Sequence, residues 1–235
     1  MKCYIPISDI EAHCFSFLPC AEDARIYLLR SRGQALCVDP CVSEEAERLL
    51  EAWGIPDCTV ILTHEHYDHT SGVNRLREIC RCNVICSDAC GRLIRDPRRN
   101  LSQYAEAQYI NLPEDVRKAA LAKIAPFSCS ADATFSGEMR MDWGGHTLTL
   151  TETLGHSKGS ICIRLDESVV FTGDSLVPHT PVVTRLPGGS KPDYYQHALP
   201  YLQSLPPDTW ALPGHFDGGR LGDLMKEVES IAAGK

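Results

Sequence analysis

Residues 63 to 72 read Thr-His-Glu-His-Tyr-Asp-His-Thr-Ser-Gly and directly follow the apolar run Cys-Thr-Val-Ile-Leu, which predicts a buried strand. Side chains of a strand alternate between its two faces, so His64 and His66 point the same way where the strand ends. The turn that follows can bring Asp68 and His69 to a neighbouring position. The segment therefore predicts a metal site at the end of a strand.

Four ligand-type side chains in one loop are too many for a single tetrahedral metal that also keeps one position open for substrate. Two neighbouring metals are the expected arrangement. Three more such side chains follow strand-like segments in glycine-containing turns, where glycine permits the positive φ and close backbone approach that the turn needs. The candidate metal ligands are His64, His66, Asp68, His69, His156, Asp174 and His215.

This order of motifs resembles the metallo-β-lactamase superfamily, whose pattern is a His-x-His-x-Asp-His segment followed by Gly-His, Gly-Asp and Gly-His. Val38-Asp39-Pro40 stands where the family carries an early Asp-bearing turn. The resemblance implies an α+β fold, a four-layer αββα sandwich with the metal site at one edge of the two β-sheets. It implies one metal on His64, His66 and His156, and a second on Asp68, His69 and His215 with Asp174 bridging.

Two divalent ions facing only two carboxylates leave the site positively charged, and metal coordination lowers the pKa of water from about 15.7 toward 7. A bridging hydroxide is therefore the expected nucleophile toward a polarised carbonyl, with Asp68 orienting it and moving a proton to the leaving group. Five imidazoles and two carboxylates suit zinc best, with iron or manganese as alternatives. Partners that orient the imidazoles are expected among Asp39, Thr63, Ser157 and Thr172.

The stretch from residue 185 to 215 is similar to glyoxalase II and its single-domain relatives, and Asp174 looks like their bridging aspartate, where some zinc β-lactamases carry cysteine. This implies hydrolysis of a thioester, ester or lactone. Two-domain glyoxalase II enzymes continue into a glutathione-binding helical domain, whereas about twenty residues follow His215 here. A smaller thioester or ester is thus expected as readily as a glutathione thioester. Substrate contacts are expected from His179, Arg185, Tyr194 and Tyr195.

The main alternative is a mononuclear iron oxygenase of the persulfide dioxygenase type, with His64, His156 and Asp174 as its two-His-one-carboxylate triad. The complete second ligand set argues against it, and against a binding module without catalysis. A β-lactamase is less expected. A nuclease is disfavoured because a net charge of −8 does not provide the positive surface that a phosphate backbone rewards.

One domain over residues 1–235 is expected, because 235 residues with 43% hydrophobic content can bury a large core. Residues 91–130 do not alternate as strands do and predict a mainly helical insertion. Its arginines are predicted to line the substrate cleft and favour an anionic substrate: Arg92, Arg95, Arg98 and Arg99. The expected partner is a small-molecule substrate, with no nucleic acid and no membrane, and the oligomeric state stays open.

The chain has no apolar stretch of about 18 residues and no signal-peptide layout at its start, which predicts a cytoplasmic protein. Its twelve cysteines are therefore expected to be reduced thiols. Four of them are spaced unlike a structural zinc site and are expected to fill buried positions: Cys80, Cys82, Cys86 and Cys90. Four histidines outside the pattern are expected to be ordinary core or surface residues, with His179 the one nearest the pattern: His13, His146, His179 and His197.

Local patterns predict helices at residues 43–53, 73–80 and 114–124, from Asp193 to Leu205 with a kink at Pro200, and at 221–231. Ser43 can cap the first helix and Gly54 can end it. Strands are expected at 14–17, 26–30, 35–38, 58–62 and 83–86, and over most of 134–172.

Overall fold

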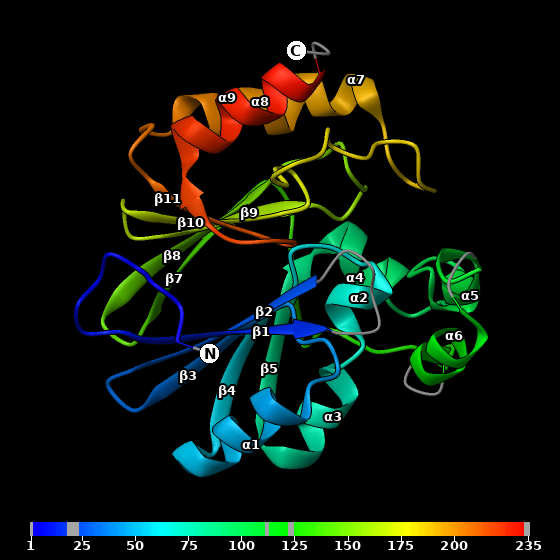
Figure 1. The fold of residues 1–235 in the computed structure, drawn as a ribbon. Helices are drawn as coiled ribbons and strands as arrows, with labels where there is room; N and C mark the ends of the chain where they lie inside the picture. Colours follow the sequence, from blue (N-terminus) through cyan, green and yellow to red (C-terminus); the bar gives the residue numbers. More distant parts are fainter. Residues whose placement is uncertain (1, 18–23, 111–112, 122–124, 233–235) are drawn as a thin grey trace.

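Two six-stranded β-sheets pack face to face in the computed structural model, with helices on both outer sides (Figure 1). The structure describes residues 2–17, 24–110, 113–121 and 125–232. The first sheet has the strand order β1-β2-β3-β4-β5-β6, and the second has the order β12-β11-β10-β9-β8-β7. This arrangement confirms the expected four-layer αββα sandwich.

The first sheet begins with antiparallel strands and continues with parallel ones from β3 to β6. Its strands are β1 (Glu11–Phe17), β2 (Ala24–Ser31), β3 (Gln34–Val38), β4 (Asp57–Ile61), β5 (Arg81–Ser87) and β6 (Ala133–Phe135). Parallel neighbours need crossover connections. These contain α1 (Glu44–Trp53), α2 (Tyr67–Thr70), α3 (Val73–Ile79), α4 (Asp88–Leu93), the 3₁₀ turn η1 (Ser102–Tyr104), α5 (Ala105–Gln108) and α6 (Glu114–Leu121).

The second sheet is antiparallel except where β10 pairs with β11 in parallel. Its strands are β7 (Glu138–Trp143), β8 (His146–Glu152), β9 (Ile161–Leu165), β10 (Val169–Gly173), β11 (Trp210–Pro213) and β12 (Gly219–Arg220). The crossover between β10 and β11 contains α7 (Lys191–Asp193), η2 (Tyr194–Ala198) and α8 (Leu199–Ser204), and the helix α9 (Leu221–Ala232) follows β12.

Three apolar cores hold the four layers together, and strand alternation divides the side chains between them. In β2, Ile26 and Leu28 pack under the helices of the first sheet, whereas Tyr27 and Leu29 enter the core between the sheets. On the other side, Val170 of β10 joins the core beneath α8 and α9. Because both sheets are packed into these cores, the ends of their strands hold the polar loops in fixed positions.

The helix α1 shows how closely local sequence signals set an element. The Ser43 hydroxyl accepts a hydrogen bond from the Ala46 amide at 3.3 Å, and Gly54 ends the helix in the left-handed conformation at φ 62°. Three glutamates in the first turn suit the positive end of the helix dipole. Both boundaries agree with the prediction.

The helix that follows β10 differs from the prediction. It begins at Lys191, and its irregularity is the π-helical η2 that lies before Pro200. Pro200 follows η2 without a break in the helix, because Ala198 and Leu199 both have helical φ and ψ. A proline within a helix lacks an amide proton and crowds the preceding turn. The irregularity expected at Pro200 therefore lies in that preceding turn, as the π-helical η2.

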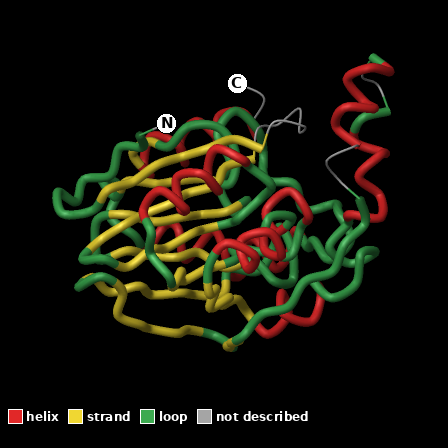
Figure 2. The backbone as a smooth tube through the Cα atoms, turned by 90° about the horizontal axis from the view of Figure 1, so that it is seen from below, coloured by secondary structure: helices red, strands yellow, loops and turns green. Residues whose placement is uncertain are grey.

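Of the helices between β5 and β6, α4 packs against the sheet, whereas α5 and α6 lie on the same side of the molecule as α2 and project beyond the sheets (Figure 1 and Figure 2). The predicted helix at 114–124 ends at Leu121, and residues 122–124 lie outside the described part. Among the helices that the structure describes, none is long and apolar enough to cross a membrane.

Candidate metal centre

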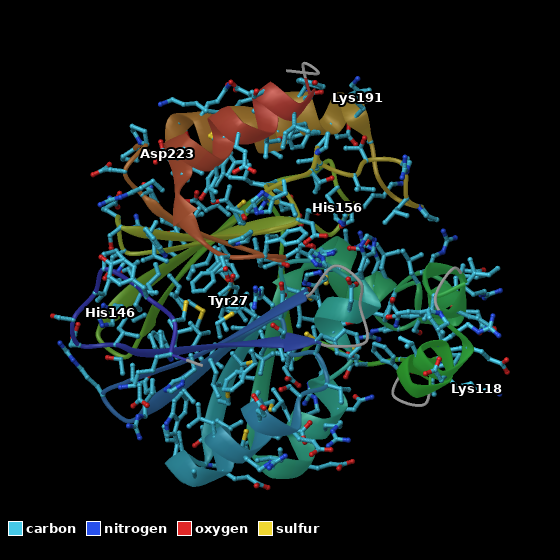
Figure 3. All side chains as sticks on the ribbon, in the orientation of Figure 1. Tyr27, Lys118, His146, His156, Lys191 and Asp223 are labelled. Atoms are coloured by element: carbon cyan, nitrogen blue, oxygen red, sulfur yellow. The ribbon has the colours of Figure 1, made fainter. Side chains whose placement is uncertain are left out.

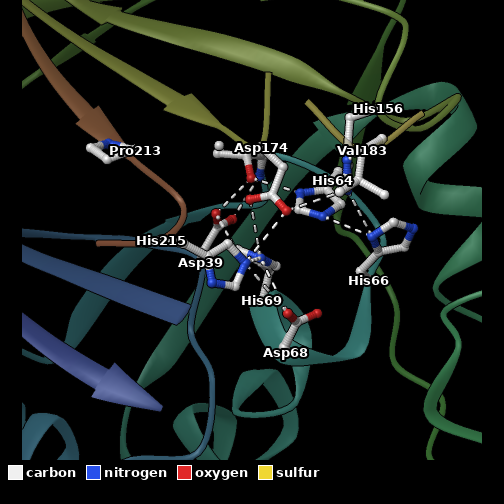
Figure 4. Close-up of polar contacts among 12 residues, drawn as sticks. Asp39, His64, His66, Asp68, His69, His156, Asp174, Val183, Pro213 and His215 are labelled. Atoms are coloured by element: carbon white, nitrogen blue, oxygen red, sulfur yellow. Dashed lines mark hydrogen bonds and ion pairs between the residues drawn. The ribbon is translucent and has the colours of Figure 1, made fainter. Parts of the chain in front are cut away.

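Loops from both sheets meet at one edge of the sandwich. The strand pairs β3/β4 and β10/β11 are parallel, so the loops after each pair emerge at the same edge. Those loops, with the one after β8, carry every ligand candidate, and the five histidines among them are almost fully buried. The structure brings all seven together (Figure 4): His64, His66, Asp68, His69, His156, Asp174 and His215.

Three imidazoles form the first cluster. Nδ1 of His66 lies 3.1 Å from Nε2 of His64 and 3.0 Å from Nε2 of His156. Burial lowers the pKa of all three imidazoles, and for His64 and His66 it does so well below the ordinary range, with neighbouring histidines adding to the effect. The three rings are therefore neutral in the metal-free protein near pH 7.

The hydrogen bonds around these rings fix where their protons lie. Nδ1 of His156 donates to the carbonyl oxygen of Val183 at 2.8 Å, so its Nε2 carries a lone pair. The Thr63 hydroxyl donates to Asp39 Oδ2 at 2.6 Å and thus accepts from Nδ1 of His64, at 3.1 Å. Two lone pairs therefore face His66 Nδ1, as expected where a cation is to be bound.

The second cluster combines two imidazoles and a carboxylate. Nε2 of His69 lies 3.3 Å from Nε2 of His215, and Asp68 Oδ2 lies 3.6 Å from both nitrogens. Asp174 lies between the clusters, because its Oδ2 is 3.4 Å from Nε2 of both His156 and His215. A carboxylate in that place can serve both clusters.

The two clusters differ in their charge in the absence of metal. Burial lowers the pKa of His69, but the carboxylates of Asp68, Asp174 and Asp39 outweigh it and raise that pKa to about 10. Burial also lowers the pKa of His215, but the Asp174 carboxylate outweighs it and raises that pKa to about 9. Burial opposes ionisation of Asp174, yet the surrounding histidines hold its pKa well below the ordinary value. The second cluster thus holds positive charge when no metal is bound.

Two of the four expected orienting residues contact the ligand histidines. Asp39 Oδ2 accepts from Nδ1 of His69 at 3.1 Å, and its Oδ1 accepts from the Thr63 amide at 2.7 Å. Asp39 has φ 54°, a left-handed conformation that Asp tolerates better than most residues. Its turn therefore links the metal loop to β3.

The expectation for the other two, Ser157 and Thr172, is not met. The Thr172 hydroxyl donates to the carbonyls of Gly173 and Leu176, and the Ser157 hydroxyl donates to Glu65 Oε2 at 2.8 Å. The partner of His156 is instead the backbone carbonyl of Val183.

Glu65 is a buried residue whose part in the site the sequence analysis missed. Its carboxylate accepts from Ser157 and from the Gly159 amide, which ties the loop of His64 and His66 to the loop of His156. Burial raises the pKa of Glu65. The signal for its importance was a carboxylate between two ligand histidines on the opposite face of the chain.

Two glycines leave room for the centre. A Cβ at Gly214 would lie 2.2 Å from Asp174 Oδ1 and 2.9 Å from His69 Cε1. A Cβ at Gly173, where φ is 48°, would lie 2.6 Å from the Thr63 hydroxyl. The glycines before Asp174 and His215 are therefore required by close approach of the loops.

The donor set fits divalent metals. Tetrahedral zinc with ligand nitrogens at 2.0–2.1 Å keeps those nitrogens about 3.3 Å apart, close to the separations in the first cluster. Asp174 Oδ1 is buried and has no hydrogen-bond partner among the described residues, as suits a carboxylate oxygen that meets a cation. Potential metal-binding groups among the described residues gather only here: His64/His66/His156, Asp39/His64/His69 and Asp68/His69/His215.

Three of the four histidines outside the pattern have other partners. His13 pairs with Glu11 at 2.9 Å and His146 with Asp166 at 2.9 Å. In Figure 3, His146 and His156 lie toward opposite ends of the sandwich. His179 pairs with Glu227 at 2.6 Å, and its ring lies edge-on to Phe216, the residue after His215. It therefore lies beside the chain segment of one ligand.

The other expected substrate residues occupy the segment before and within η2. The backbone of Tyr194 packs on Gly155, where a Cβ would lie 2.5 Å from the Tyr194 Cα. Tyr195 and Arg185 are exposed, and Lys191 lies over the ring of Tyr195 at 5.9 Å. Of the four arginines expected to line the cleft, all are exposed and Arg98 is paired with Asp96. Their contact with substrate stays a prediction.

Comparison with known proteins bears on this centre. The profile of the metallo-beta-lactamase superfamily matches residues 22–215. A hydroxyacylglutathione hydrolase of Ruegeria pomeroyi is 28% identical over 201 residues, which cover 84% of this chain and 64% of that enzyme. A probable polyketide biosynthesis zinc-dependent hydrolase of Bacillus velezensis, BaeB, is 25% identical over 202 residues, 85% of this chain and 75% of that protein.

Solved structures show the same fold. The BLEG-1 B3 metallo-beta-lactamase matches with a TM-score of 0.75 at 23% identity, over 92% of this chain and 96% of that one.

Proposed function

Because the chain belongs to the metallo-beta-lactamase superfamily, we propose that it is a dinuclear metallo-hydrolase that cleaves a thioester, ester or lactone. Members of that superfamily are mostly metal-dependent hydrolases. The observation that carries the dinuclear proposal is the position of Asp174, whose Oδ2 is equidistant, at 3.4 Å, from one histidine of each cluster. A carboxylate so placed would bridge two ions.

The carbonyl substrate class is supported by the relatives. One is a hydroxyacylglutathione hydrolase and another is described as a zinc-dependent hydrolase. Imidazole and carboxylate donors without thiolate favour zinc, with iron or manganese as alternatives. The match spans 64% of the hydroxyacylglutathione hydrolase, so glutathione itself is not part of the proposal.

His64, His66 and His156 would hold one ion, and Asp68, His69 and His215 the other. When bound, the ions lower the pKa of water and polarise a carbonyl oxygen. The protein orients the imidazoles before metal binds. Asp39, Thr63 and Val183 each accept a hydrogen bond from Nδ1 of one imidazole, so that its Nε2 faces the centre.

Asp68 is the residue proposed to move the proton. Its side chain is 13% exposed, more open than the histidines beside it, and its Oδ2 lies 3.6 Å from both His69 and His215. One carboxylate oxygen is therefore held by the cluster. The carboxylate can accept the proton of the attacking water and return it to the leaving group.

A mononuclear iron oxygenase using His64, His156 and Asp174 is the alternative. The second cluster disfavours it, because Asp68, His69 and His215 converge as closely as a metal site requires. Metal analysis of the purified protein separates the two proposals: two equivalents of zinc support the hydrolase, and one equivalent of iron would support the oxygenase.

The activity test uses ligand variants and a matched histidine control. His66→Ala and Asp174→Ala are expected to keep the fold, because both residues lie in loops at the sheet edge, and to reduce thioester or ester hydrolysis at least about tenfold. His197→Ala, at an exposed histidine of η2, is expected to retain the parent rate. Ligand variants that hydrolyse as fast as the control would overturn the dinuclear mechanism.

A further inference from the structure

A second group of potentially reactive side chains lies at the far end of the first sheet from the metal centre. Cys80 follows α3 and Cys82 lies in β5, and their Sγ atoms are 3.7 Å apart. Cys58 of β4 is the register partner of Cys82, and its thiol hydrogen-bonds to Cys80. The metal loop follows the opposite end of β4, about 13 Å of strand away. The cluster of Cys58, Cys80 and Cys82 is thus separate from the metal centre, at the opposite end of β4, a strand labelled in Figure 1.

The cluster of Cys58, Cys80 and Cys82 does not have the arrangement of a metal site. The groups of convergent ligand atoms among the described residues all belong to the metal centre, and these three thiols form none. Cys86 and Cys90, which stand close to them in the sequence, are fully buried and hydrogen-bond to each other. The four closely spaced cysteines therefore separate into two pairs, of which only Cys80 and Cys82 are partly exposed.

Solvent reaches this pair. An open recess of about 540 Å³ is lined by both cysteines together with Pro56, Arg77 and Arg81. Cys58 does not line this recess and is 2% exposed. A small molecule that enters the recess therefore meets Cys80 and Cys82, but not Cys58.

The neighbouring thiols also distinguish the two cysteines chemically. Hydrogen bonds from Cys58 and Cys82 lower the pKa of Cys80 well below the ordinary thiol value. The hydrogen bond between Cys82 and Cys80 raises the pKa of Cys82. The thiolate is the nucleophilic form of cysteine. Cys3, another partly exposed cysteine, has its pKa raised to about 11 by burial.

We propose that Cys80 and Cys82 form an oxidation site for hydroperoxides, in which Cys80 reacts first and Cys82 then closes a reversible disulfide with it. The arrangement is that of a partly exposed sulfur with a resolving cysteine in contact. Two residues of extended chain separate the Cα atoms by roughly 6.6 Å, within the range of about 4.4–6.8 Å found in disulfides.

The reaction balances with a hydroperoxide as the two-electron oxidant. Sγ of Cys80 attacks the O–O bond, forming an S–O bond and releasing an alcohol, or water from hydrogen peroxide. Sγ of Cys82 then attacks Sγ of Cys80, forming the S–S bond and releasing water that carries the thiol proton of Cys82. A dithiol reductant reverses this by exchange, and an exposed short-loop disulfide is readily reduced.

The sequence itself supplies a sharp readout. Trypsin cleaves after Arg77, Arg81 and Arg92, which places the two cysteines in separate peptides, residues 78–81 and 82–92. The full protein is treated with hydrogen peroxide, free thiols are blocked, and the digest is analysed by mass spectrometry. We expect the two peptides joined through Cys82, and separate again after reduction with dithiothreitol.

Two variants and an internal comparison complete the test. Cys82→Ser is expected to leave Cys80 as a sulfenic acid that dimedone traps on peptide 78–81, and Cys80→Ser is expected to abolish the link. Cys80 should be modified at least about tenfold faster than Cys3, because at pH 7 a thiol of pKa 11 is only about one part in ten thousand thiolate. A link from peptide 78–81 to the Cys58 peptide, or earlier oxidation of Cys3, would overturn the proposal.

Discussion

At the scale of single residues, the proposed metal centre is prepared by proton placement. Each of three ligand imidazoles gives one ring proton to a fixed acceptor: His69 to Asp39, His64 to Thr63 and His156 to Val183. The opposite nitrogens of His64 and His156 then face the centre with lone pairs, whereas that of His69 offers one only after its second proton is displaced. Such partners are worth about 10–100-fold in metal affinity in known sites.

The two clusters should release different numbers of protons when they take up metal. His64, His66 and His156 have lowered pKa values, whereas those of His69 and His215 are raised to about 10 and 9. At pH 7 metal thus meets neutral rings in the first cluster and must displace protons in the second. Affinity at the second cluster should accordingly rise with pH up to about 9 to 10.

Calorimetric titration of the metal-free protein at pH 7, in buffers of different ionisation enthalpy, measures this. The first equivalent is expected to bind with little proton release and the second with one to two protons. Equal release by both equivalents would contradict the assignment.

Glu65 is expected to control how tightly the first cluster binds metal. Glu65→Gln replaces an acceptor oxygen by an amide NH₂, so one of the donors, Ser157 or Gly159, loses its bond to residue 65. We expect metal affinity to fall about 10–100-fold with the capacity for metal unchanged. Glu106→Gln, at an exposed glutamate, is the matched control.

Competition with a chromophoric chelator measures both variants against the parent. If Glu65→Gln binds metal as tightly as Glu106→Gln, the link between the two histidine loops does not position the ligands.

At the scale of elements, the sequence predicts those helices and strands whose signals are local, such as apolar periodicity and a capping serine or glycine. The boundaries of α1 and the strands before the ligands follow from caps and apolar periodicity. The π-helical η2 could not be predicted, because it lies where Tyr194 packs on Gly155, a contact between segments 39 positions apart. The pairing of Cys58 with Cys82 likewise depends on strand register, which spacing along the chain does not reveal.

Sequence motifs predicted which side chains converge at the centre better than they predicted the hydrogen-bond partners of those side chains. The seven ligand candidates lie in motifs of fixed spacing, and the structure gathers them. The acceptor for His156 is a backbone carbonyl at Val183, which carries no residue-type signal, and the position of Glu65 between two histidines does not reveal that it contacts Ser157, 92 positions away.

Close packing of loops should make Gly214 indispensable. Its φ is unexceptional, so the effect of Gly214→Ala is steric: the new Cβ would lie 2.2 Å from Asp174 Oδ1. Since Asp174 is the proposed bridge, we expect metal content to fall from about two equivalents to about one, with activity reduced at least about tenfold.

Gly219→Ala is the matched control in the neighbouring strand β12, where the nearest atom to a new Cβ is at an ordinary 3.4 Å. Metal content is measured by elemental analysis after gel filtration. Two equivalents retained in Gly214→Ala would show that Asp174 can move without loss of the second ion.

At the scale of the whole molecule, each proposed ion would join the two sheets. The first would bind His64 and His66 from the first sheet and His156 from the second, and the other would bind His69 and His215 from opposite sheets. Without metal, the sheets still share the central apolar core and bonds such as Tyr27 Oη to the Pro213 carbonyl at 2.7 Å. Removing metal should therefore lower the thermal stability of the protein without unfolding it.

Thermal unfolding with and without a chelator tests this last expectation. An ion present at 1,000 times its Kd stabilises the native state by about 4 kcal/mol, and each kcal/mol shifts the Tm of a domain of this size by about 2–4 °C. One tightly bound ion should therefore raise the Tm by about 8–16 °C. In His66→Ala the chelator should produce a smaller shift than in the exposed control His197→Ala. If chelation leaves the Tm of the parent protein unchanged, metal does not link the sheets, since a ligand that binds only the native state must stabilise it.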